Sequence, residues 1–239
     1  MKKKNFKIFI DFDGTLSQQD VGEVLFQKFG EEEKVNKIID DLLNGRISSK
    51  QSWIKLCNTV PSVTTDELNG FLDTMLIESS FHSFKEFCKE QDFEIYVLSD
   101  GFDYYIDRVL RKNKIDGVVV YSNHLEIIDG KLHPSFPHYD DSSFRSANCK
   151  WNHIINHSSD DDYTVFIGDG NSDKETVEYC DFIFAKDDLL KYCEKERVTY
   201  FPFNNFDDVT IRLNELKEKK RLKKRHRAVL KRKQAYLIE

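Results

Sequence analysis

The sequence predicts an α/β fold built on a parallel sheet, and three features indicate it. Short, continuous apolar runs alternate along the chain with segments whose apolar residues recur at helical spacing. Such runs are typical of central strands in a parallel sheet, because these strands are buried on both faces. Several runs end in carboxylate or hydroxyl side chains. With 239 residues, the chain can form one large domain that carries a smaller inserted one.

The first half of the chain begins with a strand predicted at residues 7–10. From Val21 to about Phe84, apolar residues recur at helical spacing, with Gly45 and Pro61 as breaks. We therefore expect a helical insert whose apolar faces are explained by packing. A helix over 80–89 then leads into a second buried strand at 94–98, which is predicted to stop at Ser99.

The second half of the chain continues the alternation of strands and helices. Its expected elements are, in order, a helix through 104–110, a short strand at 118–121, a hairpin or irregular excursion over 123–148, a helix over 149–157, a strand at 164–167, a helix through Val177 and Cys180, a strand at 182–185, a helix over 187–193 and an apolar stretch at 200–203. Helical connections between parallel strands predict right-handed crossovers.

The composition excludes several classes of protein. Hydrophobic residues make up 39% and charged residues 33% of the chain, which is typical of a globular protein in water. No apolar run approaches the roughly 18 residues needed to cross a bilayer. The apolar stretch after the first lysines is too short for a secretory signal and is interrupted by Asp11. The five cysteines form no Cys-x-x-Cys pair, so we expect reduced thiols and a cytoplasmic protein.

The charge is distributed unevenly along the chain. Residues 217–239 hold 11 Lys and Arg and two Glu, whereas the preceding residues hold 25 basic and 40 acidic side chains. The basic tail could bind RNA or an anionic membrane by counterion release, or be a solvated helix or extension. We favour the second interpretation, because the acidic body would repel a polyanion.

The first strand delivers two carboxylates, a glycine and a hydroxyl in the sequence Asp11-Phe12-Asp13-Gly14-Thr15. Side chains alternate along a strand, so Asp11 and Asp13 would lie on the same side if the extended backbone persists. Two carboxylates held this close favour a hard cation such as Mg²⁺ between them. An ordinary turn is the alternative, and the spacing does not fit a calcium loop.

Chemically useful side chains also follow two later strands. Ser99 ends the second strand, while Asp169 and Asp173 follow the strand at 164–167, and Lys150 opens a helix. Ligands of open α/β sheets bind beyond the carboxyl ends of the strands, where these groups could converge. The set provides what phosphate-ester cleavage needs: a nucleophile, an acid and base, and cations for the phosphate oxygens. This interpretation requires that Asp11, Ser99, Lys150 and Asp169 line one pocket.

Each of these assignments has a structural alternative. Ser99 could simply cap the following helix, Lys150 could be a solvated lysine, and Asp173 could be a helix N-terminal charge.

With these motifs, the sequence resembles haloacid dehalogenase (HAD) phosphatases from residue 5 to 210. The resemblance implies that Asp11 is the nucleophile and Asp13 the general acid and base. It also implies that Asp169 is a metal ligand and that Asp173 is a ligand or orients a metal-bound water. The Asp13 carbonyl would complete the Mg²⁺ ligands, and Ser99 and Lys150 would hold the phosphate.

The helical insert resembles the cap of the phosphoserine-phosphatase-like branch of this family. The implied division is a Rossmann-like core over 1–16 and 85–212, a helical cap over 17–84 and a basic helix or tail over 213–239. Within the branch, Ser99-Asp100-Gly101 and Cys149-Lys150 are most similar to phosphatases of methionine salvage, which act on a 2-hydroxy-3-keto-5-methylthiopentenyl 1-phosphate. The phosphoserine enzymes usually have glycine where Asp100 stands.

Several further residues are candidates for binding substrate or phosphate. They are Thr15, Asp100 and Gly101 in the motifs, Asp20 and Glu23 at the entrance to the cap, and Arg46 within the cap. A solvated helix charge is the alternative for Asp20 and Glu23.

We therefore expect a Mg²⁺-dependent phosphatase for a small metabolite. The alternative substrates are phosphoserine, phosphocholine or phosphoethanolamine, and pyridoxal phosphate. The non-enzyme alternative is a catalytically silent protein that binds RNA or another partner through its tail. We expect a monomer or homodimer.

Overall fold

The computed structural model describes residues 4–236. Residues 1–3 of the predicted core and 237–239 of the predicted tail lie outside the described residues. Within 4–236, the strands form one sheet with the order β4-β3-β2-β1-β5-β6-β7. The strands are β1 (Phe6–Ile10), β2 (Glu94–Phe102), β3 (Val119–Ile128), β4 (Lys131–Ser135), β5 (Tyr163–Gly168), β6 (Phe182–Ala185) and β7 (Phe201–Pro202).

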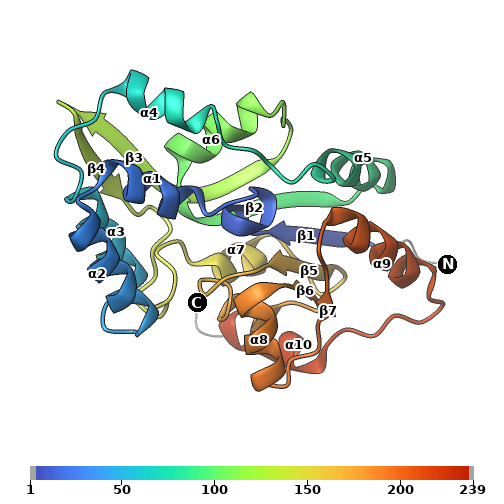
Figure 1. The fold of residues 1–239 in the computed structure, drawn as a ribbon. Coiled ribbons are helices and arrows are strands. Elements are labelled where there is room, and N and C mark those ends of the chain that lie inside the picture. Colours follow the sequence, from blue (N-terminus) through green and yellow to red (C-terminus); the bar gives the residue numbers. More distant parts are fainter. Residues whose placement is uncertain (1–3, 237–239) are drawn as a thin grey trace.

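Helices connect these strands and cover the sheet (Figure 1). They are α1 (Val21–Phe29), α2 (Glu32–Leu43), α3 (Ser49–Cys57), α4 (Thr65–Leu72), α5 (Phe81–Gln91), α6 (Asp103–Lys112), α7 (Lys150–Asn156), α8 (Asp187–Lys195), α9 (Phe206–Glu218) and α10 (His226–Tyr236). The predicted alternation of strands and helices is confirmed.

The sheet is parallel except at one edge. β1 is central and pairs in parallel with both β2 and β5, so that Ile8 lies between Ile95 and Val165. At the edge, β3 and β4 form an antiparallel hairpin through Asp129 and Gly130, both of which have positive φ. This two-residue turn is the kind whose twist suits a tight hairpin. It shows that the predicted excursion at 123–148 begins as a hairpin.

Alternate side chains of β1 enter two apolar layers. Ile8 and Ile10 pack in the larger cluster, which includes residues of α5, α6 and α9. Phe9 points to the other side of the sheet and packs with residues of α7 and α8. Both faces are therefore covered by helices, as the continuous apolar run predicted.

Helices α1 to α4 follow β1 and precede α5, which confirms the predicted helical insert. In Figure 1, α1, α2 and α3 gather at the end of the molecule that carries β4. Local sequence sets where these helices begin. The Asp20 side chain caps α1, and Ser48 and Thr64 form capping boxes at α3 and α4. Each cap satisfies backbone N–H groups that have no partner inside the helix.

The structure differs from three local predictions. The second strand does not stop at Ser99, because β2 continues to Phe102 after a change of register beyond Leu98. The predicted helix through Val177 and Cys180 is a single 3₁₀ turn, η2 (Thr176–Tyr179). The predicted boundary at residue 213 falls within α9, where buried leucines pack against the body.

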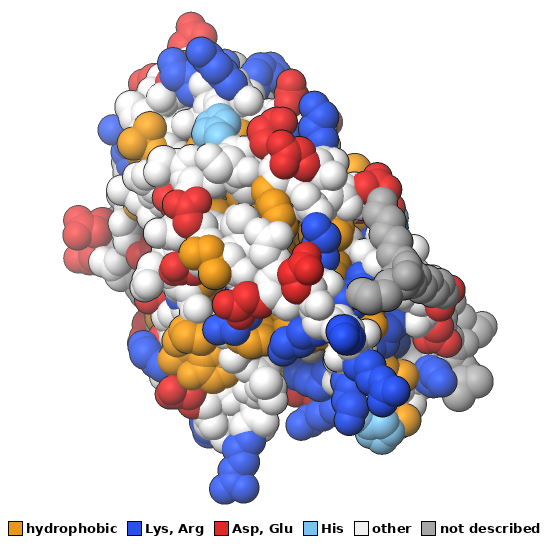
Figure 2. All heavy atoms as spheres, turned by 90° about the vertical axis from the view of Figure 1, so that its right-hand side faces the viewer, with side chains coloured by type: hydrophobic (Ala, Val, Ile, Leu, Met, Phe, Trp, Pro, Cys, Tyr) orange, Lys and Arg blue, Asp and Glu red, His pale blue; other side chains and the backbone are white. Residues whose placement is uncertain are grey.

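The C-terminal basic segment folds back onto the body. Arg232 is buried and its guanidinium lies 3.2 Å from the Asp181 carboxylate, while it also donates to the Thr164 hydroxyl at 2.9 Å. Six other Lys and Arg residues of this segment are exposed, namely Lys219, Lys220, Arg221, Lys223, Arg227 and Lys233. Figure 2 shows basic side chains gathered on one face of the molecule. Tertiary contacts therefore hold α10 against the core.

No helix within residues 4–236 is both long enough and apolar enough to cross a membrane.

Candidate active site

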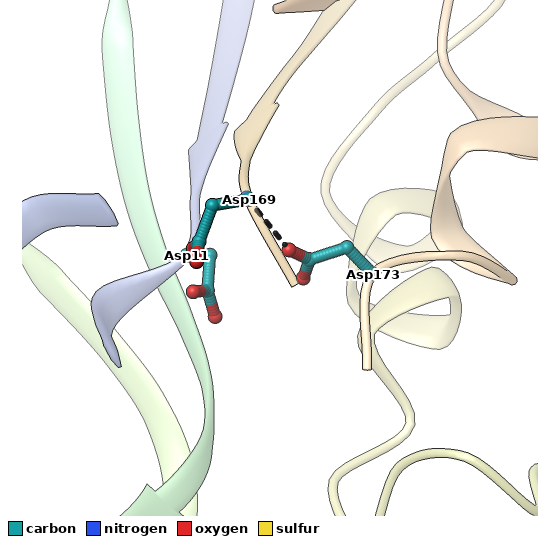
Figure 3. Close-up of side chains that lie close together, drawn as sticks. All are labelled: Asp11, Asp169 and Asp173. Carbon is teal, nitrogen blue, oxygen red and sulfur yellow. Dashed lines mark hydrogen bonds between the residues drawn. The ribbon is translucent and has the colours of Figure 1, made fainter. Parts of the chain in front are cut away.

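Three aspartates meet where the two central strands end (Figure 3). Asp11 follows β1, Asp169 follows the neighbouring parallel strand β5, and Asp173 lies in the next loop. One carboxylate oxygen from each lies within 4.8 Å of the others. The Asp173 carboxylate is turned toward this point by the Asp169 N–H, which donates to its Oδ2 at 3.2 Å.

Gly14 allows the loop after β1 to approach this centre. Its φ of 77° is in the left-handed region, and a Cβ on it would lie 2.6 Å from Asp169 Oδ2. A side chain at position 14 would therefore displace the Asp169 carboxylate.

Lys150 lies fully buried among the aspartates, at the first turn of α7. Its Nζ donates to Asp173 at 2.7 Å and to the Ser172 hydroxyl at 3.1 Å, and it also donates to Asp11. Burial by itself would lower the pKa of Lys150, but the charges of Asp11 and Asp173 outweigh it and raise the pKa. The ammonium is therefore the fixed positive charge of this centre.

The acidic cluster fits a divalent cation. Burial, followed by the charge of Asp173, raises the pKa of Asp11 well above its ordinary range, and the same causes raise the pKa of Asp169 to about 6. A cation among these oxygens would relieve their repulsion. The Thr15 hydroxyl donates to Asp169 Oδ1 at 2.5 Å, which orients the carboxylate. A carboxylate set of this kind suits a hard metal ion.

Asp13 has a different environment from Asp11. Its Oδ1 accepts a hydrogen bond from Val21 N at 2.9 Å, and its Oδ2 accepts from Tyr105 Oη at 3.0 Å and Ser99 Oγ at 3.2 Å. Burial, then the charge of Asp20, raises the pKa of Asp13 to about 8. A pKa raised in this way favours the protonated form of Asp13, which can donate a proton.

The four groups expected to line one pocket lie close together, but two of them line the cavity and two are buried behind its wall. Asp11 and Asp169 line the cavity. Ser99 and Lys150 are buried directly behind it and bond to the carboxylates of Asp13 and Asp11. The Ser99 hydroxyl also accepts from Gly101 N at 2.9 Å. The predicted convergence is therefore met in part, with two residues on the wall and two supporting it.

A cavity of about 270 Å³ opens above the aspartates. One end is polar and holds Asp11, Asp13 and Asp169. The wall that comes from the helical insert is mainly apolar, although Asp20, Glu23, Ser49 and Ser52 also belong to it. Its apolar lining residues are Phe26, Ile39, Leu42, Leu43, Trp53 and Leu56. A ligand in this cavity would therefore meet the carboxylates of the core and, on the insert, mainly apolar side chains with two further carboxylates.

The cap candidates lie in different places. Asp20 and Glu23 line the cavity, and Asp20 also caps α1 by accepting from Glu23 N at 2.7 Å. Arg46 is not among the lining residues. Its guanidinium lies at the exposed end of α2, where it pairs with Asp40 and Asp41. These local ion pairs hold Arg46 away from the site.

Asp100 and Gly101 also line the cavity, but Asp100 is engaged by protein groups on both oxygens. Sequence reasoning missed two further site residues, Tyr105 and Arg145. Tyr105 contacts Asp13 from α6, and the exposed Arg145 lines the cavity and donates to Asn171 Oδ1 at 3.0 Å. Neither position carries a local signal, since Tyr105 matches an ordinary core residue and Arg145 lies in an irregular loop.

Comparison with known proteins decides the family. The model of the haloacid dehalogenase-like hydrolases matches residues 8–178. This chain belongs to that family. The match covers the strands and helices that bring Asp11, Lys150 and Asp169 together.

Relatives cover nearly the whole chain. A protein of Bacillus cereus named 2-hydroxy-3-keto-5-methylthiopentenyl-1-phosphate phosphatase is 30% identical over 219 residues, which are 90% of this chain and 99% of the relative. A protein of Bacillus mycoides with the same name is also 30% identical, over the same shares. The expected family and the enzyme class, a phosphoric monoester hydrolase, are confirmed.

Solved structures confirm the fold. A substrate-bound phosphoserine phosphatase superposes with a TM-score of 0.66 at 20% identity, over 89% of this chain and 99% of that one. A phosphoserine phosphatase with an analogue of its phospho-aspartyl intermediate gives a TM-score of 0.65 at 21% identity, over 90% and 99%.

Proposed function

We propose that this hydrolase is a Mg²⁺-dependent phosphatase that forms an aspartyl-phosphate on Asp11. One observation supports the mechanism above all. Two carboxyl groups from the same loop line one cavity with different partners, because Asp11 accepts from the Lys150 ammonium whereas Asp13 accepts from Val21 N and from the hydroxyls of Tyr105 and Ser99. A carboxylate nucleophile and a separate carboxylic acid are the two groups that a two-step ester cleavage needs.

In the first step, an Asp11 oxygen forms a bond to phosphorus while the bond from phosphorus to the ester oxygen breaks. Asp13 gives its proton to the leaving oxygen, so that the product departs as an alcohol. In the second step, water attacks the phosphorus of the aspartyl-phosphate while the bond from phosphorus to the Asp11 oxygen breaks, and the Asp13 carboxylate takes a proton from the water. Inorganic phosphate leaves, and Asp11 and Asp13 return to their starting forms.

Asp11, Asp169 and Asp173 are the side chains that would hold Mg²⁺, and the Asp13 carbonyl is proposed as a further ligand. When bound, the ion supplies positive charge to the phosphate oxygens. Lys150 fixes the Asp11 and Asp173 carboxylates, and Thr15 fixes Asp169. We propose that Ser99, behind the Asp13 carboxyl, turns to phosphate when it binds.

The substrate proposed is a small phosphate ester whose other end is apolar, such as 2-hydroxy-3-keto-5-methylthiopentenyl 1-phosphate. The apolar wall of the cavity supports this choice over phosphoserine. Phosphoserine would bring an ammonium and a carboxylate, for which Asp20, Glu23 and Arg145 offer charged partners, but it has no apolar part to bury against the six apolar side chains of that wall. A methylthioalkyl chain would bury there favourably. Arg145, at the rim, can pair with an anionic oxygen of the ligand.

The proposed division keeps the predicted core (1–16 and 85–212) and cap (17–84), whereas the first residues of the predicted basic tail (213–239) belong to α9, which packs on the core. It also keeps the expectation of a monomeric or homodimeric cytoplasmic enzyme. The intact acidic centre disfavours the silent, RNA-binding alternative.

The test is phosphate release from a panel of esters, with Mg²⁺ and with EDTA, for the wild type and Asp11→Asn. The panel contains the methylthiopentenyl 1-phosphate, phosphoserine, phosphocholine, phosphoethanolamine and pyridoxal phosphate. We expect Mg²⁺-dependent turnover that Asp11→Asn abolishes, with the highest kcat/KM for the methylthio ester. Equal turnover in Asp11→Asn would refute the mechanism, and a preference for phosphoserine would refute the substrate assignment.

A further inference from the structure

The Asp100 carboxylate stands between three segments that are far apart in the sequence. Asp100 follows Ser99 on β2, and the two oxygens of its side chain face opposite ways. Oδ1 faces the loop that precedes Lys150, and Oδ2 faces helix α3 of the insert. A carboxylate offers about four acceptor positions, and protein donors use both of its oxygens.

The Oδ1 side of Asp100 holds the loop that leads into Lys150. It accepts from Ser146 Oγ at 2.8 Å, from Asn148 N at 3.0 Å and from Ala147 N. Asn148 is itself fixed to β2, because its Nδ2 donates to Ser99 O at 2.7 Å. Asn148, two residues before Lys150, is therefore hydrogen-bonded to β2 at both Ser99 and Asp100.

The Oδ2 side of Asp100 holds the insert. It accepts from Trp53 Nε1 at 3.1 Å and from the Ser49 hydroxyl, both on α3. The same helix contributes Trp53 and Leu56 to the apolar wall of the cavity. Ser49 N also donates to Phe144 O at 3.2 Å, in the segment just before Ser146. The apolar wall and the Lys150 loop therefore meet at one carboxylate.

This arrangement argues against direct binding of phosphate by Asp100. Both of its oxygens already accept hydrogen bonds from the protein, and a carboxylate beside a phosphate dianion would repel it. A contact that joins the insert to the catalytic loop is a better account of the same residue.

We propose that Asp100 is a positioning residue that links closure of the insert over the cavity to the placement of Lys150. The inference rests on the proposed function only for its kinetic consequences. When Ser49 and Trp53 of α3 donate to Oδ2, the apolar wall lies over the substrate. At the same time, Oδ1 holds the loop that positions Lys150 beside Asp11. Opening of the insert breaks the hydrogen bonds from Ser49 and Trp53 and leaves those to the loop.

Two substitutions separate the two sides of Asp100. Asp100→Asn keeps a carbonyl oxygen for the three donors of the loop but turns an amide N–H₂ toward Trp53, so it weakens the insert side. Ser146→Ala removes one donor on the loop side and leaves the insert side intact. Asp73→Asn is a matched control, because Asp73 pairs with Arg108 at 2.7 Å in another contact between the insert and α6.

The first readout needs no substrate. The chain has two tryptophans, and the half-buried Trp151 stacks on Tyr179 away from α3, so Trp151→Phe leaves Trp53 as the reporter of α3. In that background, we expect Asp100→Asn to raise acrylamide quenching of Trp53 at least about twofold, because lost hydrogen bonds to a charged acceptor favour opening. Ser146→Ala and Asp73→Asn should leave quenching unchanged. Unchanged quenching in Asp100→Asn would overturn the proposal even if no substrate were turned over.

The second readout is a separation of KM from kcat on the best ester of the panel. Asp100→Asn should raise KM about tenfold, whereas Ser146→Ala should lower kcat about tenfold with little change in KM. Ser49→Ala should resemble Asp100→Asn, and the double variant should be no worse than Asp100→Asn alone, because both remove one contact. Fully additive effects of Asp100→Asn and Ser49→Ala on KM would overturn the linkage, and so would an equal change of KM in Asp73→Asn. Thermal unfolding of each variant identifies any general loss of structure.

Discussion

Removal of the Lys150 charge tests the central ion cluster most directly. In Lys150→Met, a side chain of similar length lacks the ammonium that bonds to Asp11 and Asp173, and the side chains of Lys150 and Asp173 have no exposed surface. Removing one partner of a buried ion pair leaves an uncompensated charge, at a cost of about 3–5 kcal/mol. We expect the free energy of unfolding to fall by about this amount in the absence of metal.

Urea unfolding in EDTA, followed by circular dichroism, measures this loss. Mg²⁺ should restore more stability in Lys150→Met than in the wild type, because a cation that binds only the folded state stabilises it and here replaces a missing charge. Lys191→Met is the control, since it removes an exposed lysine paired with Asp188 at 2.8 Å. Its stability should stay within experimental error. A loss below about 1 kcal/mol in Lys150→Met would refute the buried cluster as the source of stability.

Three further predictions concern the acid, a close packing contact and the pH dependence of stability. Asp13→Asn should lower kcat/KM, which reports the first step, for an alkyl phosphate by roughly 10²–10⁴ and for p-nitrophenyl phosphate by much less, because that leaving group needs no proton; equal losses in kcat/KM would argue against Asp13 as the acid. Gly101→Ala should abolish activity, because its Cβ would lie 1.5 Å from Tyr105 Oη, which contacts Asp13, whereas Gly70→Ala meets nothing within 4 Å and should leave turnover unchanged. Burial lowers the pKa of His153 to about 3. As the pH falls, the unfolded chain therefore binds a proton at His153 before the folded protein does, and stability should fall as the pH drops from about 6.5 toward 3. Between pH 6.5 and 4.5 this loss is about 2 kcal/mol, and His153→Gln should reduce it in urea titrations at each pH.

Local sequence determined much of this molecule. The apolar run before Asp11 predicts a strand buried on both faces, and the apolar runs that end before Ser99 and Asp169 follow the same pattern. These signals are local, because side-chain alternation, capping and turn chemistry act within a few residues. For this reason, the α/β alternation, the helical insert and the cluster of acidic groups could be predicted before any contact was known.

Packing decided what the local signals could not. Arg46 and Asp100 were both candidates for binding substrate, but the structure pairs Arg46 with acidic neighbours at the exposed end of α2 and joins Asp100 to α3 and the Lys150 loop. Tyr105 has the spacing of a core residue, yet its hydroxyl reaches Asp13. Each outcome depends on which segments, dozens of residues apart, lie against each other. Sequence periodicity identifies which face of a helix or strand is buried. The partner of each polar group depends instead on how all the helices and strands pack together when the chain folds.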